Sequence, residues 1–163
     1  MLASTLTLAL VLDARAADSA ATAGATAVPA GWPTDPEVAA VYRALSVRDP
    51  VPSCASVEAL ASEPTKTLLE IVQVAQMPPW AGIRAANCLV EGHAVELQST
   101  LQAWVADPGT KGLAIVVMGS LDRMPVSVSV PVAQAALAGP MADLLRPKVE
   151  VAVAPEVRAL VGR

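Results

Sequence analysis

The sequence predicts an all-α domain. Apolar residues recur every three or four positions in segments of about 11 to 13 residues, the period of a helix with one buried face. Proline and glycine separate these segments, as short connections between antiparallel helices require. The chain is 54% hydrophobic but has no Phe, so its core must be built from Ala, Val and Leu. Such small side chains favour close packing of helix on helix.

The first predicted helix has a clear start signal. Thr34 or Asp35 caps it, and Pro36 takes the first helical position. Its apolar positions follow the i, i+3, i+4, i+7 pattern and are Val38, Val41, Tyr42 and Leu45. The Asp49-Pro50 pair then ends the segment.

Further helices are predicted through the middle of the chain, at residues 53–61, 64–76, 80–91, 95–106 and 110–121. Gly92 is expected to close one of them, and Thr110 to cap the last. Residues 115–118 are all apolar, so a helix there has no polar face. We therefore expect the helix over 110–121 to be the most buried.

The C-terminal third has two interpretations. Residues 126–130 and 149–153 alternate with period two, which is a strand signal. Pro131 and Pro147 lie next to these runs and weaken that signal. We favour helices over 131–137 and 155–161; the alternative is an α+β fold with a small C-terminal hairpin.

The N-terminus predicts export. Residues 2–12 form an apolar run, and the small-x-small pattern that follows ends at Ala16. We therefore expect a signal peptide over 1–16, a flexible Ala/Thr/Gly/Pro leader over 17–33 and one domain over 34–163, in a periplasmic or secreted protein. The apolar run is shorter than the roughly 20 residues that span a bilayer, so no integral membrane segment is expected. No Lys or Arg precedes the run, and an Ala-rich leader without cleavage is the alternative.

Cys54 and Cys88 are the two cysteines. In an exported protein, such a pair is most simply a disulfide; the alternative is two small buried hydrophobic residues. There is no CxxC pair, and the single histidine cannot complete a zinc site with them. No metal or cofactor is expected.

The charge pattern argues against nucleic acid as a partner. The formal net charge is −4, and no Lys/Arg cluster is present to contact phosphates. The few aromatic residues offer little surface on which bases could stack.

His93 is the candidate for catalysis, because histidine is the most frequent general base. It follows Gly92 at the expected end of a helix, where it can simply interact with the last carbonyl groups. There is no GxSxG motif and no phosphate-binding loop. We therefore predict no enzymatic activity, and a hydrolase with a dispersed site around His93 is an alternative.

Four segments resemble the helix signature of HEAT-like repeats. In this signature an aliphatic residue is often followed by Arg, then by small residues and finally by Leu. They are residues 35–45, 82–89, 112–119 and 155–160, and the second and third are 30 positions apart. The resemblance covers residues 35–161. It implies an α-solenoid of the HEAT or armadillo kind that binds proteins, and it transfers no catalytic residue.

Three residues are candidates for the contact surface of such a fold. Trp80, Arg84 and Trp104 lie on helices that flank one predicted repeat junction, although both tryptophans also suit a core position. The predicted function is an exported, non-enzymatic protein-binding or scaffolding module. An accessory or inhibitor-like domain acting on a specific partner is the alternative.

Overall fold

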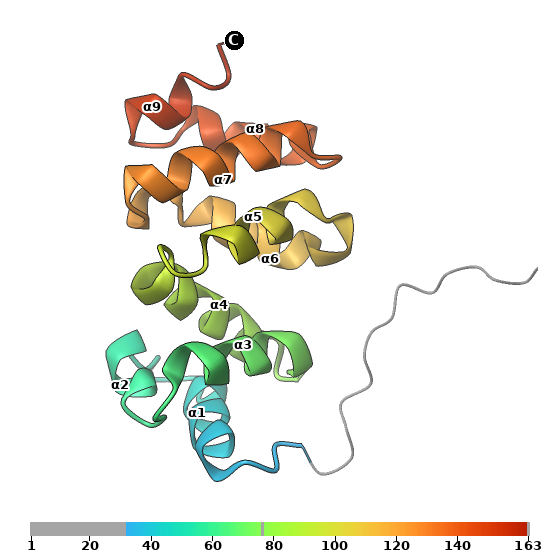
Figure 1. Ribbon diagram of the computed structural model, residues 1–163. Helices are drawn as coiled ribbons and strands as arrows, with labels where there is room; N and C mark the ends of the chain where they lie inside the picture. The colour runs from blue at the N-terminus through green and yellow to red at the C-terminus, as the bar shows by residue number, and fades with distance from the viewer. Residues whose placement is uncertain (1–31, 76, 163) are drawn as a thin grey trace, which may run out of the picture.

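The computed structural model describes residues 32–75 and 77–162, and the regular elements in these ranges are all helices (Figure 1). The all-α prediction is confirmed. The helices are α1 (Pro36–Ser46), α2 (Cys54–Glu58), α3 (Pro64–Val74), α4 (Pro79–His93), α5 (Gln98–Ala106), α6 (Lys111–Gly119), α7 (Val126–Ala138), α8 (Ala142–Glu150) and α9 (Pro155–Arg158). Short 3-10 turns, η1 (Pro108–Thr110) and η2 (Leu121–Arg123), flank α6. The predicted signal peptide and the leader up to residue 31 lie outside the described residues.

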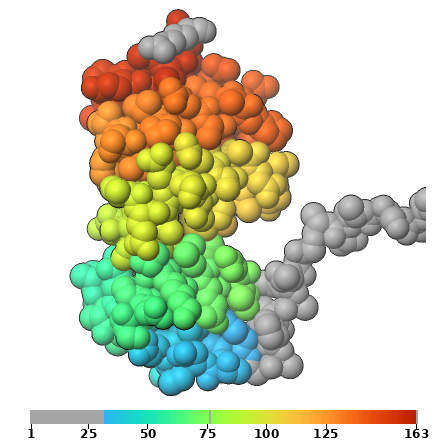
Figure 2. Space-filling model, in the orientation of Figure 1, coloured from blue at the N-terminus to red at the C-terminus, as the bar shows by residue number. Residues whose placement is uncertain are grey.

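The helices stack in chain order, from α1 at one end to α9 at the other (Figures 1 and 2). Neighbouring helices pair as α3 with α4, α5 with α6 and α7 with α8. Along the stack, α4 contacts α6, α6 contacts α8, and α5 packs against α7. Each pair is thus held mainly by the pair before it and the pair after it. In the part of the chain described, no helix has the length and apolar character needed to cross a membrane.

The core is built from aliphatic side chains, as the composition predicts. Its largest fully buried members include Leu45, Leu68, Ile71, Leu89, Leu101 and Leu145. Trp104 on α5 belongs to the same core and is 9% exposed. The aromatic residues all lie in or before α5, and the sequence beyond Trp104 contains none.

Local signals set the helix starts. The Asp35 carboxylate accepts hydrogen bonds from the backbone N–H groups of Glu37 and Val38, and Pro36 opens α1. Pro64 and Pro79 open α3 and α4 in the same way. Proline suits this position because the first N–H groups of a helix have no partner within it.

Gly92 does not end its helix, contrary to the prediction. α4 continues through it to His93, and α5 begins at Gln98 rather than at residue 95. A Cβ atom at position 92 would lie 3.2 Å from Oε1 of Glu58. The glycine therefore gives this carboxylate room to approach α4, at the cost of about 1 kcal/mol that glycine carries inside a helix.

α6 is not buried on all sides, contrary to the prediction that it would be the most buried helix. Val117 and Met118 are buried, but Ile115 is 43% exposed. The Thr110 hydroxyl does not cap the helix either, and donates instead to the carbonyl oxygens of Trp104 and Asp107. α6 therefore buries one face only.

The C-terminal third is helical, the interpretation favoured from the sequence. α7 begins at Val126 and contains Pro131 in its interior, so the predicted start at Pro131 is wrong. The valines alternate in sequence, but the buried positions Val128, Val132 and Ala136 are four residues apart. Packing against α5 selects the helical period over the alternating pattern.

Candidate functional site

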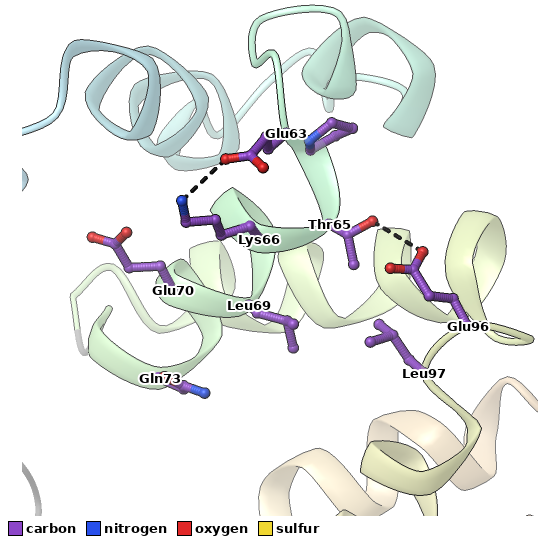
Figure 3. A pocket seen from close by; sticks show the side chains of 9 residues that line it. Glu63, Thr65, Lys66, Leu69, Glu70, Gln73, Glu96 and Leu97 are labelled. Atoms are coloured by element: carbon purple, nitrogen blue, oxygen red, sulfur yellow. Dashed lines mark hydrogen bonds and ion pairs between the residues drawn. The ribbon is translucent and has the colours of Figure 1, made fainter.

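A groove of about 600 Å³ lies between α3 and the corner where α4 leads into α5 (Figure 3). It is lined by Glu63, Pro64, Thr65, Lys66, Leu69, Glu70, Gln73, Glu96 and Leu97. Leu69 on α3 and Leu97 just before α5 provide its apolar walls. Leu97 is buried and Leu69 is half-buried against the core. The apolar part of the groove is therefore continuous with the core and fixed by it.

The rim of the groove is acidic. Glu63, Glu70 and Glu96 contribute carboxylates, and Lys66 contributes an ammonium group. Lys66 Nζ lies 3.0 Å from Oε2 of Glu63, and both side chains are exposed. The hydrogen bond and the charge of Glu63 raise the pKa of Lys66, and the charges of Asp35 and Glu70 add to this effect. The ammonium group thus lies in a negative local potential.

Trp32 holds one of these carboxylates in place. Its indole Nε1 donates a 2.8 Å hydrogen bond to Oε1 of Glu70. Its ring packs edge-on against Tyr42, with 4.9 Å between the ring centroids. The last residues before α1 therefore fold back onto α3 and orient Glu70.

A polar row behind the groove joins three helices. The Thr65 hydroxyl on α3 lies 2.9 Å from Nδ1 of His93 on α4, and Nε2 of His93 lies 3.3 Å from Oε1 of Glu58 on α2. Nε2 of His93 and Oε1 of Glu58 are both buried. Thr65 also donates to Oε2 of Glu96 at 3.4 Å, the contact drawn in Figure 3. The row ties the groove rim to the helices beneath it.

The chemistry of this row is that of a hydroxyl, an imidazole and a carboxylate in series. Such an arrangement can accept a proton from the hydroxyl and stabilise the resulting imidazolium. Here the Thr65 hydroxyl also contacts Glu96, and a carboxylate next to an attacking oxygen disfavours an anion there. The geometry fits a structural connection between α2, α3 and α4 better than an activated nucleophile.

Two of the predicted contact residues meet at the end of α1. The Arg84 guanidinium donates to the carbonyl oxygens of Leu45 at 2.8 Å, of Arg48 at 3.3 Å and of Val47. Trp80 Nε1 donates a 3.1 Å hydrogen bond to the backbone carbonyl oxygen of Ser46. The last carbonyl groups of a helix have no partner within it, so these two side chains complete the C-terminal end of α1.

The structure does not bring Trp104 to the same place. It lies in the core on α5, whereas Trp80 and Arg84 contact the end of α1. None of the three lines the groove. Their role in partner binding stays a prediction.

We expect Arg84→Ala to lower the free energy of unfolding by about 1–3 kcal/mol, because charge-assisted hydrogen bonds to several carbonyl groups are lost together. Arg84→Lys should retain part of this, since an ammonium group can still reach one carbonyl. Urea unfolding followed by circular dichroism measures the difference. An unchanged midpoint for Arg84→Ala would show that these bonds contribute nothing to stability.

Cys54 on α2 and Cys88 on α4 form a disulfide, as predicted. The bridge holds the short α2 next to α4, and Glu58 at the end of α2 reaches His93 from there. Among residues 32–75 and 77–162, no group of three or more His, Cys, Asp or Glu side chains is placed to hold a metal ion.

Sequence reasoning missed the groove. Glu63, Leu69 and Glu70 belong to α3 or directly precede it, whereas Glu96 and Leu97 follow α4. Opposite charges at i, i+3 and i+7, from Glu63, Lys66 and Glu70, are a local signal of a charged surface here. The remaining residues come together only through tertiary packing.

By fold and site, the protein is an all-α stack of helical pairs with an acidic groove. No family model, no curated protein and no solved structure matches the chain.

Proposed function

We propose that the protein is an exported, non-enzymatic protein-binding or scaffolding module of the HEAT-like helical-repeat type. The observation that carries the proposal is the groove beside α3. It combines apolar walls, formed by Leu69 and Leu97, with a charged rim. A partially apolar groove with a polar rim is the usual form of a peptide or protein contact site.

The packing of the helices supports this assignment. α5 packs along α7, but α3 and α5 have little contact, and the groove lies between α3 and the residues just before α5. A stack of helical pairs whose layers separate on one side offers an extended surface to a partner. The sequence resemblance to HEAT-like repeats favours the same type of binding.

The disulfide supports the exported part of the proposal. Disulfides persist in oxidising compartments and are rare in the cytosol of most organisms. Together with the apolar N-terminal run, the Cys54–Cys88 bridge favours a periplasmic or secreted location.

The test is a variant that fills the groove. Gln73 lies on its edge and is exposed, so Gln73→Trp should occupy the space without changing the core. When the protein is crosslinked to its partner in the native envelope fraction, we expect the yield of crosslinked partner to fall about tenfold, because the added indole takes the space that a partner side chain would fill. Gln134→Trp, the same change at an exposed position on α7, is the matched control. Both variants should melt within a few degrees of the parent.

Two outcomes would contradict the proposal. One is capture of the partner that is unaffected by Gln73→Trp, which would place binding elsewhere. The other is ester hydrolysis by the parent protein that is lost in Thr65→Ala and His93→Ala, which would favour a hydrolase. If the captured partner is an enzyme that the protein inactivates, the role is that of an inhibitor-like domain.

A further inference from the structure

We propose that the groove binds a lysine- or arginine-bearing extended segment of the partner protein. In this arrangement, cationic side chains contact Glu70 and Glu96, and an apolar side chain lies between Leu69 and Leu97. The inference rests on the proposed function and adds the chemistry of the partner.

The acidic surface extends past the groove. A second hollow of about 220 Å³ lies beyond Glu63 and Lys66 and shares these residues and Glu70 with the groove. It adds Asp35 and Glu37. We call the carboxylates of the two hollows together the acidic track: Asp35, Glu37, Glu63, Glu70 and Glu96. Among the residues that the structure describes, Lys66 is the one basic residue that lines either hollow.

Lys66 shows how the track holds a cation. Its ammonium group lies between the two hollows, 3.0 Å from Glu63, and the charges of Asp35 and Glu70 act on it as well. Its side chain is 76% exposed. A flexible, exposed lysine can move aside and leave the same carboxylates to a cationic side chain of a partner.

Three carboxylates of the track accept hydrogen bonds from other residues of the chain before a partner arrives. Trp32 donates to Glu70, and Thr65 donates to Glu96. Oε2 of Glu37 accepts two hydrogen bonds from Ser62, from its backbone N–H at 2.7 Å and from its hydroxyl at 2.8 Å. Each carboxylate has a second oxygen besides the one that these donors contact. Fixed acceptors reduce the ordering that a ligand must otherwise impose on binding.

Charge also decides which occupant fits. A nucleic acid or an anionic lipid surface would be repelled by the track. The chain's own leader, residues 17–33, contains no Lys or Arg, so it lacks the complementary charge. A basic segment of another protein matches both the carboxylates and the apolar walls.

The experiment uses the disulfide-bonded protein and short fluorescein-labelled peptides that alternate leucine with lysine, glutamine or glutamate. We expect the lysine peptide to bind most tightly and its affinity to fall with added salt. Glu70→Gln/Glu96→Gln keeps both hydrogen-bond acceptors but removes two charges. Fluorescence anisotropy should show about a fivefold loss of affinity for the lysine peptide in this variant, in line with two partly screened ion pairs. Circular dichroism melts confirm that each variant is folded.

The matched control removes two charges at the far end of the stack. Asp143→Asn/Glu150→Gln changes exposed residues of α8 and should leave the affinity unchanged. Equal losses in both double variants would reduce the effect to net charge and overturn the inference. Binding of the glutamate peptide as tight as that of the lysine peptide would overturn it too. So would a second copy of the chain in the groove, which sedimentation would show as a dimer.

The two proposals fail in different ways. If Gln73→Trp abolishes capture of the partner while no lysine peptide binds, the groove is a binding site for another kind of segment and only the inference fails. If Gln73→Trp leaves partner capture unchanged and no peptide binds, the proposed function fails as well.

Discussion

Val117→Asp is expected to lower the free energy of unfolding by more than about 4 kcal/mol, a larger loss than that expected for Arg84→Ala, because it buries a carboxylate without a partner. Val117 is 0% exposed and lies on the face of α6 that meets the core. Domains of this size have only about 5–15 kcal/mol of total stability. We therefore expect the variant to be largely unfolded by circular dichroism at temperatures where the parent is folded.

Ile115→Asp provides the control within the same helix. Ile115 is 43% exposed, so a carboxylate there remains hydrated, and we expect a loss of about 1 kcal/mol or less. A similar loss for the two variants would mean that α6 does not bury one face selectively.

Removal of the disulfide is expected to cost about 4 kcal/mol at 25 °C, from the chain entropy of a loop closed across a sequence separation of 34. Cys54→Ala/Cys88→Ala avoids placing a hydroxyl at position 88, which is 3% exposed. α2 comprises only five residues and is too short to be stable alone. Loss of the bridge should therefore release α2 first, together with the contact between Glu58 and His93.

Urea unfolding of the double variant, compared with the oxidised parent, measures this cost. The parent treated with a reductant should unfold at the same urea concentration as the variant. A difference in stability below about 1 kcal/mol would show that packing alone keeps α2 in place.

Much of the fold could be predicted because the signals for helix starts are local. Asp35 and Pro36 specify the start of α1 within two residues, and Pro64 and Pro79 do the same for α3 and α4. Helix ends and interiors depend on neighbours in space. The carboxylate that lies close to Gly92 within α4 belongs to Glu58 on another helix, which no local pattern records.

The candidate site was less predictable for the same reason. The disulfide followed from cysteine number and the expected compartment. The groove instead requires α3 to face the corner after α4, and its residues carry no shared motif. Arg84 has the helical position of a contact residue, but the carbonyl groups that it meets belong to the far end of α1.

The placement of the aromatic residues determines what optical probes report. Tryptophan emission comes from Trp32, Trp80 and Trp104, all located in or before α5. α8 and α9 have at most slight contact with α5, so emission reports little of these two last helices. Far-ultraviolet dichroism records every helix. In a stack where each layer depends on its neighbours, the C-terminal layers can fray before the rest. Dichroism then changes while emission stays constant, and coincidence of the two curves becomes a direct test of cooperativity along the stack.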